Sequence, residues 1–128
     1  MKNQYLVLLL MPVLMNTGCK KEKTNGEDII CTMQAVSGLN VNVRLQNGTN
    51  LQTKDITVIA RDGAYTEVLV GYSLLNEPYF SGAIERKGNY VITVTKTGYK
   101  TFTSNTISVL ADSCHVIPQV VNVVLQPQ

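Results

Sequence analysis

The chain contains no tryptophan, a single histidine and no large excess of charge of either sign. Its 128 residues include 11 lysines and arginines and 9 aspartates and glutamates, which gives a formal net charge of +2. The basic residues are scattered except at Lys20, Lys21 and Lys23. Nucleic-acid binding needs a basic face that neutralises several phosphates, so this distribution argues against a nucleic-acid partner. Glycine-rich phosphate loops and spaced histidine clusters are also missing, and no cofactor is expected.

Helical patterns are absent as well. After the first 28 residues, no run of about 12 residues repeats apolar side chains at helical spacing. Valine, isoleucine and threonine dominate the second half, and branched side chains pack well on a pleated sheet. Residues 39–46 alternate strictly between apolar and polar, and turn signals recur about every ten residues. The sequence therefore predicts one all-β domain over residues 29–128, with the architecture of a sandwich or barrel.

Several segments are candidate strands. Residues 29–36 are the first, and 119–126 the last. An Asp-Gly turn joins 56–63 to 64–73, and this pair is the strongest local hairpin candidate. Residues 99–110 form one further candidate strand.

The amino terminus has the pattern of a secretory signal peptide. One lysine precedes an apolar run of about 11 residues, from Tyr5 to Met15. A membrane-spanning helix needs about 20 apolar residues, and Pro12 interrupts helical hydrogen bonding. An uncleaved membrane anchor is the alternative that this length argues against.

The residues after the apolar run resemble the lipobox of bacterial lipoproteins. Thr17, Gly18 and Cys19 fit the last three positions of that motif, whereas Asn16 stands where leucine is usual. The resemblance implies cleavage after residue 18 and a diacylglycerol on Cys19, so that acyl chains such as palmitate hold the protein on a membrane. Residues 19–28 are then a flexible tether. Lys20 replaces the aspartate that signals inner-membrane retention in such lipoproteins, which favours the outer membrane.

Two cysteines remain if Cys19 carries lipid. Cys31 and Cys114 bracket almost the whole predicted domain, and a secreted protein can keep a disulfide oxidised. We expect them to be bonded, which ties the first strand to the last, and the alternative is two separately buried thiols. With His115 they supply three soft ligands where zinc usually has four, so no metal site is expected.

The segment "GNYVITVTKTGYKTF" resembles the carboxypeptidase regulatory-like domain. Gly88, Tyr90, Gly98 and Tyr99 carry the resemblance, which extends loosely from Leu39 to Leu125. It implies an antiparallel β-sandwich of the transthyretin (prealbumin) type with approximately seven strands. It also implies a non-catalytic binding or structural role, without cofactor or catalytic residues. The frequent "Pro-Leu-x-Gly" signature of that family is missing from the first hairpin.

One segment raises the question of catalysis. Asp112, Ser113, Cys114 and His115 are adjacent, and they motivate the alternative function of a small secreted hydrolase acting on envelope polymers. Successive side chains of an extended segment point to opposite faces, so Cys114 and His115 diverge instead of forming a nucleophile and base. A structural role for His115 is the favoured interpretation.

Aromatic and apolar residues between Gly71 and Arg86 are more numerous than a loop needs. Exposed patches of this kind mark contact sites for proteins or glycans. The predicted binding surface is formed by Tyr72, Leu75, Tyr79 and Phe80. In the alternative, Tyr79 and Phe80 belong to a core strand. We expect a lipid-anchored module of the cell envelope that binds a protein or carbohydrate partner, either in the periplasm or at the cell surface.

Overall fold

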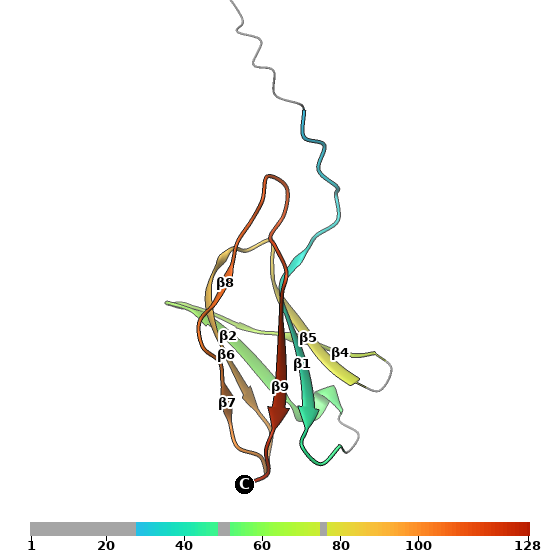
Figure 1. The fold of residues 1–128 in the computed structure, drawn as a ribbon, viewed down its shortest axis with the longest axis vertical. Coiled ribbons are helices and arrows are strands. Elements are labelled where there is room, and N and C mark those ends of the chain that lie inside the picture. Colours follow the sequence, from blue (N-terminus) through green and yellow to red (C-terminus); the bar gives the residue numbers. More distant parts are fainter. Residues whose placement is uncertain (1–27, 49–51, 75–76) are drawn as a thin grey trace, which may run out of the picture.

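Nearly all regular structure in the described part of the chain consists of β-strands, arranged in two sheets (Figure 1). The computed structural model describes residues 28–48, 52–74 and 77–128. The predicted leader (1–18), the lipidation residue Cys19 and Leu75 lie outside these residues. The strands are β1 (Ser37–Leu45), β2 (Thr57–Asp62), β3 (Tyr65–Val68), β4 (Val70–Leu74), β5 (Glu77–Ile84), β6 (Gly88–Thr95), β7 (Phe102–Thr103), β8 (Ile107–Val109) and β9 (Gln119–Leu125). A short 3-10 helix, η1 (Thr53–Asp55), precedes β2.

The first sheet has the strand order β4-β5-β1-β9, and the second has the order β3-β2-β6-β7, with β8 also paired to β6. The all-β prediction is confirmed, but the described residues form nine strands where about seven were expected. Residues 99–110 form two short strands, and Ser104 lies directly after the first of them. Its side-chain oxygen accepts a hydrogen bond from the Ile92 amide at 2.9 Å, and its own amide donates to the Ile92 carbonyl.

The expectation of a wholly antiparallel sandwich is wrong at one place. The first and last strands, β1 and β9, pair in parallel from Leu39 with Gln119 to Leu45 with Leu125. Parallel neighbours need a long connection, which the whole intervening domain supplies. Every other strand pair in the described residues is antiparallel.

The predicted hairpin is confirmed at its turn, but the prediction for its second strand is wrong. β2 and β3 pair from Ile59 with Val68 to Asp62 with Tyr65, and Gly63 takes a positive φ of 56° in the turn. The return segment is not one strand, however. It crosses between the sheets at the buried Leu69, so that β3 belongs to the second sheet and β4 to the first.

The core lies between the two sheets and follows the alternation of the strands. β1 directs four apolar side chains inward, and β6 directs Tyr90, Ile92 and Val94 inward. The buried apolar residues are Leu39, Val41, Val43, Leu45, Ile56, Val58, Ala60, Leu69, Phe80, Ala83, Tyr90, Ile92, Val94, Val109, Val116, Val123 and Leu125. Within the described ranges, no helix is long and apolar enough to span a membrane.

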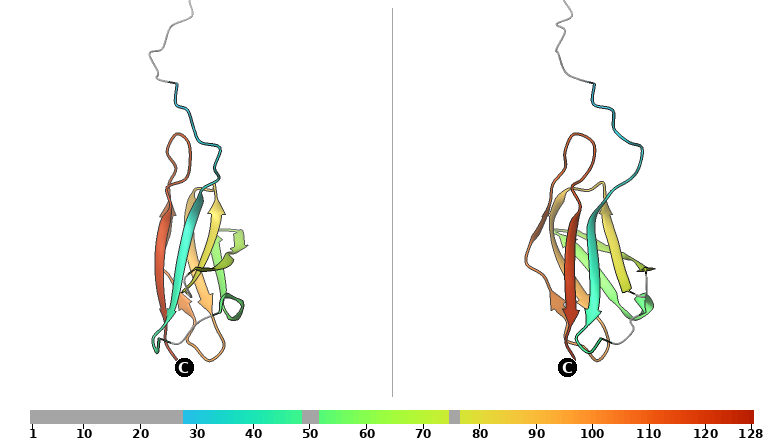
Figure 2. Two further views of the ribbon diagram at one scale, coloured as in Figure 1. Left: turned by 90° about the vertical axis from the view of Figure 1, so that its right-hand side faces the viewer. Right: turned by 45° about the vertical axis from the view of Figure 1, so that its right-hand side comes forward.

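The segment before β1 forms no strand, so the prediction of a strand over 29–36 is wrong. Residues 28–35 are exposed, and the side chains of Ile29, Ile30 and Met33 meet little protein. This segment leaves the domain at the same end as the loop between β8 and β9, opposite the carboxyl terminus (Figures 1 and 2). We call this the disulfide end.

Candidate functional site

A disulfide joins Cys31 to Cys114 at the disulfide end, which confirms the predicted pairing. The two Cα atoms are 5.3 Å apart across a sequence separation of 83 residues. Neither cysteine lies in a strand, because Cys31 precedes β1 and Cys114 lies in the loop between β8 and β9. The bond therefore ties the amino-terminal segment to that loop, and does not tie two strands together.

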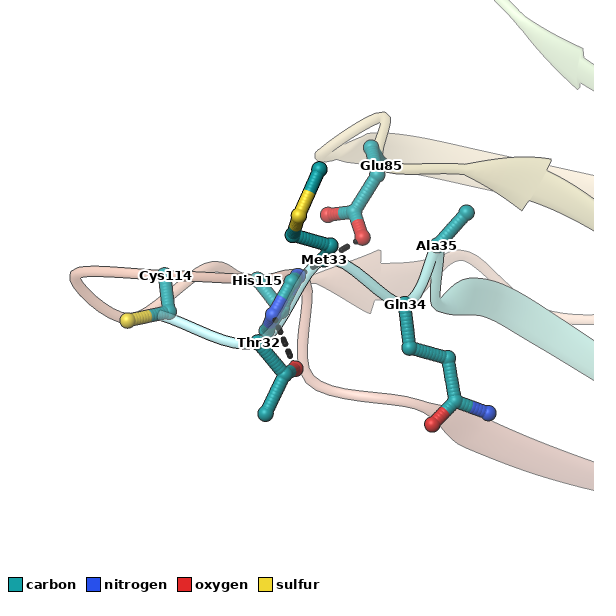
Figure 3. Close-up of a pocket in the computed structure, with 7 residues that line it drawn as sticks. All are labelled: Thr32, Met33, Gln34, Ala35, Glu85, Cys114 and His115. Carbon is teal, nitrogen blue, oxygen red and sulfur yellow. Dashed lines mark hydrogen bonds and ion pairs between the residues drawn. The ribbon is translucent and has the colours of Figure 1, made fainter. Parts of the chain in front are cut away.

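Glu85 fastens the same two segments beside the disulfide (Figure 3). Its Oε1 accepts a hydrogen bond from the Val36 amide at 2.7 Å and lies 2.8 Å from His115 Nδ1. The other ring nitrogen of His115, Nε2, lies 3.0 Å from the Thr32 hydroxyl. The Val36 amide is the main cause that lowers the pKa of Glu85, and the hydrogen bond with His115 lowers it further.

Asp112 shapes the loop that carries Cys114. Its carboxylate accepts hydrogen bonds from the amides of Cys114 and His115 at 2.8 and 2.9 Å. These two bonds, with that from His115 the larger cause, lower the pKa of Asp112. A carboxylate that closes a turn onto the amides of following residues is a common loop motif. The run of Asp, Ser, Cys and His that raised the question of catalysis thus has a structural explanation.

The chemistry available at the disulfide end is limited. Seven residues line a surface hollow of about 500 Å³: Thr32, Met33, Gln34, Ala35, Glu85, Cys114 and His115. The Cys114 sulfur is in the disulfide and so is not a nucleophile, and both ring nitrogens of His115 have partners. In the described ranges, no group of three or more histidine, cysteine, aspartate or glutamate side chains could hold a metal ion.

A row of polar and aromatic side chains crosses the outer face of the first sheet. Strand register places Tyr72 opposite Tyr79, Tyr79 opposite Asn42, and Asn42 beside Asn122. Residues directly opposite each other on neighbouring strands share one face of a sheet. These four residues, contributed by β4, β5, β1 and β9, form what we call the aromatic–amide face.

The members of this face contact one another in pairs. The rings of Tyr72 and Tyr79 are stacked, with centroids 5.2 Å apart and planes 24° apart. The Asn42 side chain donates a hydrogen bond to the Asn122 side chain at 3.0 Å. Arg44 and Glu77 form an ion pair of 2.9 Å one step along the same strands. Both of these side chains are well exposed, so the pair adds little stability.

The residues predicted to form a binding surface separate in the structure. Tyr72 and Tyr79 lie together on the outer face, and Tyr72 is 47% exposed. Phe80, the neighbour of Tyr79 on β5, is only 2% exposed and belongs to the core. Adjacent residues of a strand point to opposite faces, so Tyr79 and Phe80 cannot share one surface.

Sequence reasoning missed Asn122 as a member of the face. The alternation in β1 already directs Asn42 and Arg44 away from the core, but nothing local shows which strand lies beside β1. Asn122 reaches the row only through the parallel pairing of β1 with β9. The alternation within residues 119–126 was the one available signal, and it locates a face without locating a neighbour.

A second polar cluster lies around Arg86, in the turn between β5 and β6, and its partners belong to the second sheet. One guanidinium nitrogen of Arg86 lies 2.8 Å from Asp62 Oδ2 and donates to the Tyr90 hydroxyl at 2.7 Å. The guanidinium also lies 3.8 Å from the centre of the Tyr65 ring. The hydrogen bond with Tyr90, followed by that with Asp62, raises the pKa of Arg86. The cluster satisfies the polar end of a buried tyrosine, and its role is in folding.

Comparison of the chain with protein family models and with curated proteins finds no match. Of the two features, the disulfide end has the side chains of Glu85, His115 and Asp112 bonded within the site. The aromatic–amide face presents rings and amides to solvent, and it is the stronger candidate for binding.

Proposed function

We propose that this protein is a lipid-anchored, non-catalytic module of a bacterial cell envelope, which binds a protein or glycan partner through the aromatic–amide face. The observation that carries the proposal is the row of Tyr72, Tyr79, Asn42 and Asn122 on an exposed sheet face. Tyrosine is enriched at interfaces because one ring offers both apolar area and a hydroxyl group. The two amides add donors and acceptors that a partner can use.

Further exposed side chains on the same face support binding. Val120 and Val124 flank Asn122 on β9 and are largely exposed, as is Val70 on β4. These three valines and the two tyrosines place apolar area among polar side chains. Contact sites on proteins commonly have this mixed composition. The proposed partner therefore offers both apolar surface and hydrogen-bonding groups.

The anchoring half of the proposal rests on the sequence around Cys19. The lipobox resemblance supports lipid attachment there, and Lys20 favours the outer membrane. The Cys31–Cys114 bond fixes where the chain leaves the domain, only 12 positions after Cys19. An anchor at Cys19 would hold the domain close to the bilayer by a short tether.

We also infer that the fold is of the transthyretin type found in carboxypeptidase regulatory-like domains. Two residues of the resembling segment support this inference. Tyr90 is fully buried in β6, and Gly98 takes a positive φ of 81° in the turn that follows β6. A core ring and a turn glycine at these two positions are what the resemblance implies.

The anchor is tested by metabolic labelling with a fatty-acid analogue. The full-length chain is expected to incorporate the label and to fractionate with membranes, and Cys19→Ala is expected to lose both properties. Cys31→Ser serves as the matched control, because it removes a cysteine that the proposal assigns to the disulfide. Labelling that survives in Cys19→Ala would refute lipid attachment at that residue, and it would leave the binding face untouched.

The binding face is tested by photo-crosslinking in intact cells. A photoreactive amino acid at position 72 is expected to form a discrete adduct of higher mass with the partner, at least tenfold more abundant than at position 68. Val68 is a suitable control because it is also well exposed but lies on β3 in the other sheet. Equal adducts at both positions would count against the face, whatever the outcome of the labelling experiment.

A further inference from the structure

β9 is an edge strand with backbone groups that no other strand uses. In the described part of the chain its neighbour within the sheet is β1 alone, and Figure 2 shows it at the rim of that sheet. The Leu125 carbonyl points toward β1, because it accepts the Gln46 amide at 3.0 Å. Backbone groups alternate in direction along a strand. The N–H and C=O groups of Val120, Asn122 and Val124 therefore point away from β1.

In the described residues this edge is covered only at its ends: the Ile117 amide donates to the Leu110 carbonyl just before β9, and the Lys100 amide donates to the Gln126 carbonyl just after it. Natural proteins guard edge strands with charges, prolines or covering segments. β9 contains no charged residue and no proline, and between residues 101 and 128 the only residue counted as charged at neutral pH is Asp112. By contrast, β3 carries Glu67, and β4 at the far edge of the first sheet contacts η1, which carries Lys54 and Asp55.

The sequence of β9 is complementary to itself. Residues 120–124 are Val-Val-Asn-Val-Val, which reads the same in both directions around Asn122. We propose that two copies of this chain associate by antiparallel pairing of their β9 strands, with Asn122 opposite Asn122 of the second copy. In this register Val120 faces Val124 of the other copy. The residues with outward backbone groups then meet one another, as hydrogen-bonded antiparallel pairs require.

The side chains on the outer face fit the same register. Val120 and Val124 are 64% and 56% exposed in one copy, and they would cover each other across the seam. The hydrogen bond from Asn42 to Asn122 would continue through the second Asn122 to the second Asn42. The two four-stranded sheets would become one continuous sheet, and if the proposed function holds, that sheet presents two binding faces on one side.

The pairing is also compatible with two anchors in one membrane. Antiparallel β9 strands send the two disulfide ends to opposite ends of the dimer. Residues 19–28 can extend over at most roughly 33–36 Å. Both anchors therefore reach one bilayer when the dimer lies along the membrane surface. The association itself depends on β9 and not on the anchor, so it stands or falls separately from the proposed function.

The register is tested with single cysteines in the full-length chain under mild oxidation in membranes. Opposite residues of a hydrogen-bonded antiparallel pair have Cα atoms about 5.5 Å apart, which suits a disulfide. Asn122→Cys is expected to form disulfide-linked dimers at least tenfold more than Val120→Cys or Val124→Cys alone. Co-expression of Val120→Cys with Val124→Cys is expected to restore the crosslink. Val68→Cys, an equally exposed thiol on β3, controls for random collision.

The outcomes are separable. Absence of the Asn122→Cys dimer, or equal dimers from all four thiols, would overturn the proposal. A second measurement does not depend on added cysteines: the mass of the unmodified chain in mild detergent is expected to be that of a dimer. Asn122→Lys places like charges opposite each other and is expected to give a monomer, whereas Val68→Lys stays dimeric. A monomeric unmodified chain would likewise refute the pairing.

Discussion

Replacing Tyr90 with alanine is expected to lower the free energy of unfolding by about 3–5 kcal/mol. Tyr90 is fully buried and is the largest such side chain in the described residues. Its ring meets the Tyr65 ring edge to face, with centroids 6.5 Å apart. Truncation would leave a cavity between the sheets and remove these contacts.

Tyr90→Phe keeps the ring and removes only the hydroxyl, so it measures the hydroxyl's contribution to stability by itself. The hydroxyl accepts a hydrogen bond from Arg86 at 2.7 Å and donates one to the Arg86 carbonyl at 3.0 Å. Loss of both is expected to cost about 1–3 kcal/mol, because the carbonyl and one guanidinium N–H are left without this partner. Chemical denaturation followed by circular dichroism measures each difference.

Tyr72→Ala is the matched control for Tyr90→Ala. It removes the same ring from an exposed position, and its cost is expected to stay below about 1.5 kcal/mol, the value of a stacked pair. Equal losses in the two alanine variants would contradict the assignment of Tyr90 to the core and Tyr72 to the outer face.

Removal of the disulfide, by Cys31→Ser with Cys114→Ser, is expected to lower the free energy of unfolding by about 2 kcal/mol. A separation of 83 residues by itself would correspond to about 4.5 kcal/mol of loop-closure entropy in the unfolded chain. The structure predicts a smaller loss of stability than this value. Residues 28–35 are exposed, so without the bond they regain freedom in the folded protein too.

The size of this reduction follows from the geometry of the disulfide end. In the folded protein the bond closes only a short loop, from Cys31 through Val36 and Glu85 to Cys114, which we take as about ten residues. Closing a ten-residue loop corresponds to about 2.7 kcal/mol. Subtracting this from the value for the unfolded chain leaves about 2 kcal/mol. Urea denaturation of the oxidised protein and the double variant measures the difference. A loss of about 4.5 kcal/mol would show that the segment stays docked without the bond, and no loss would contradict this explanation.

Hydrogen exchange gives an independent check on the same variant. The Val36 amide, which donates to Glu85, is expected to lose protection when the disulfide is removed. Amides in the centre of β6 are expected to keep theirs, since β6 pairs with β2, β7 and β8 away from the bond. Uniform loss of protection would indicate that the bond supports the whole domain.

Local patterns in the sequence predicted much of the fold. The alternation over residues 39–45 located β1 and its inner face, and the Asp-Gly turn located the β2–β3 hairpin. Both depend on interactions between residues close in sequence or on the period of a strand, which are visible in a single chain. The prediction at residues 29–36 was wrong for the opposite reason: branched apolar residues favour a strand, but none of the described strands pairs with this segment.

The candidate site could be predicted only in part. The excess of aromatic residues around β4 and β5 was visible, but Tyr79 and Phe80 could be assigned to opposite faces only once β5 was known to be a strand. The Cys31–Cys114 bond followed from counting cysteines. Its position outside the strands did not, because that depends on where β1 begins and where the loop before β9 lies.

The sequence by itself determined the fold class, the pairing of Cys31 with Cys114 and the inner side chains of the clearest strands. Tertiary structure alone decided that β1 lies beside β9 in parallel, and hence that Tyr72, Tyr79, Asn42 and Asn122 form one row. It also decided that, among the described strands, β9 has β1 as its one neighbour in the sheet. The physical reason is that a strand's period fixes which side chains share a face, whereas its neighbours depend on contacts between residues far apart in the chain.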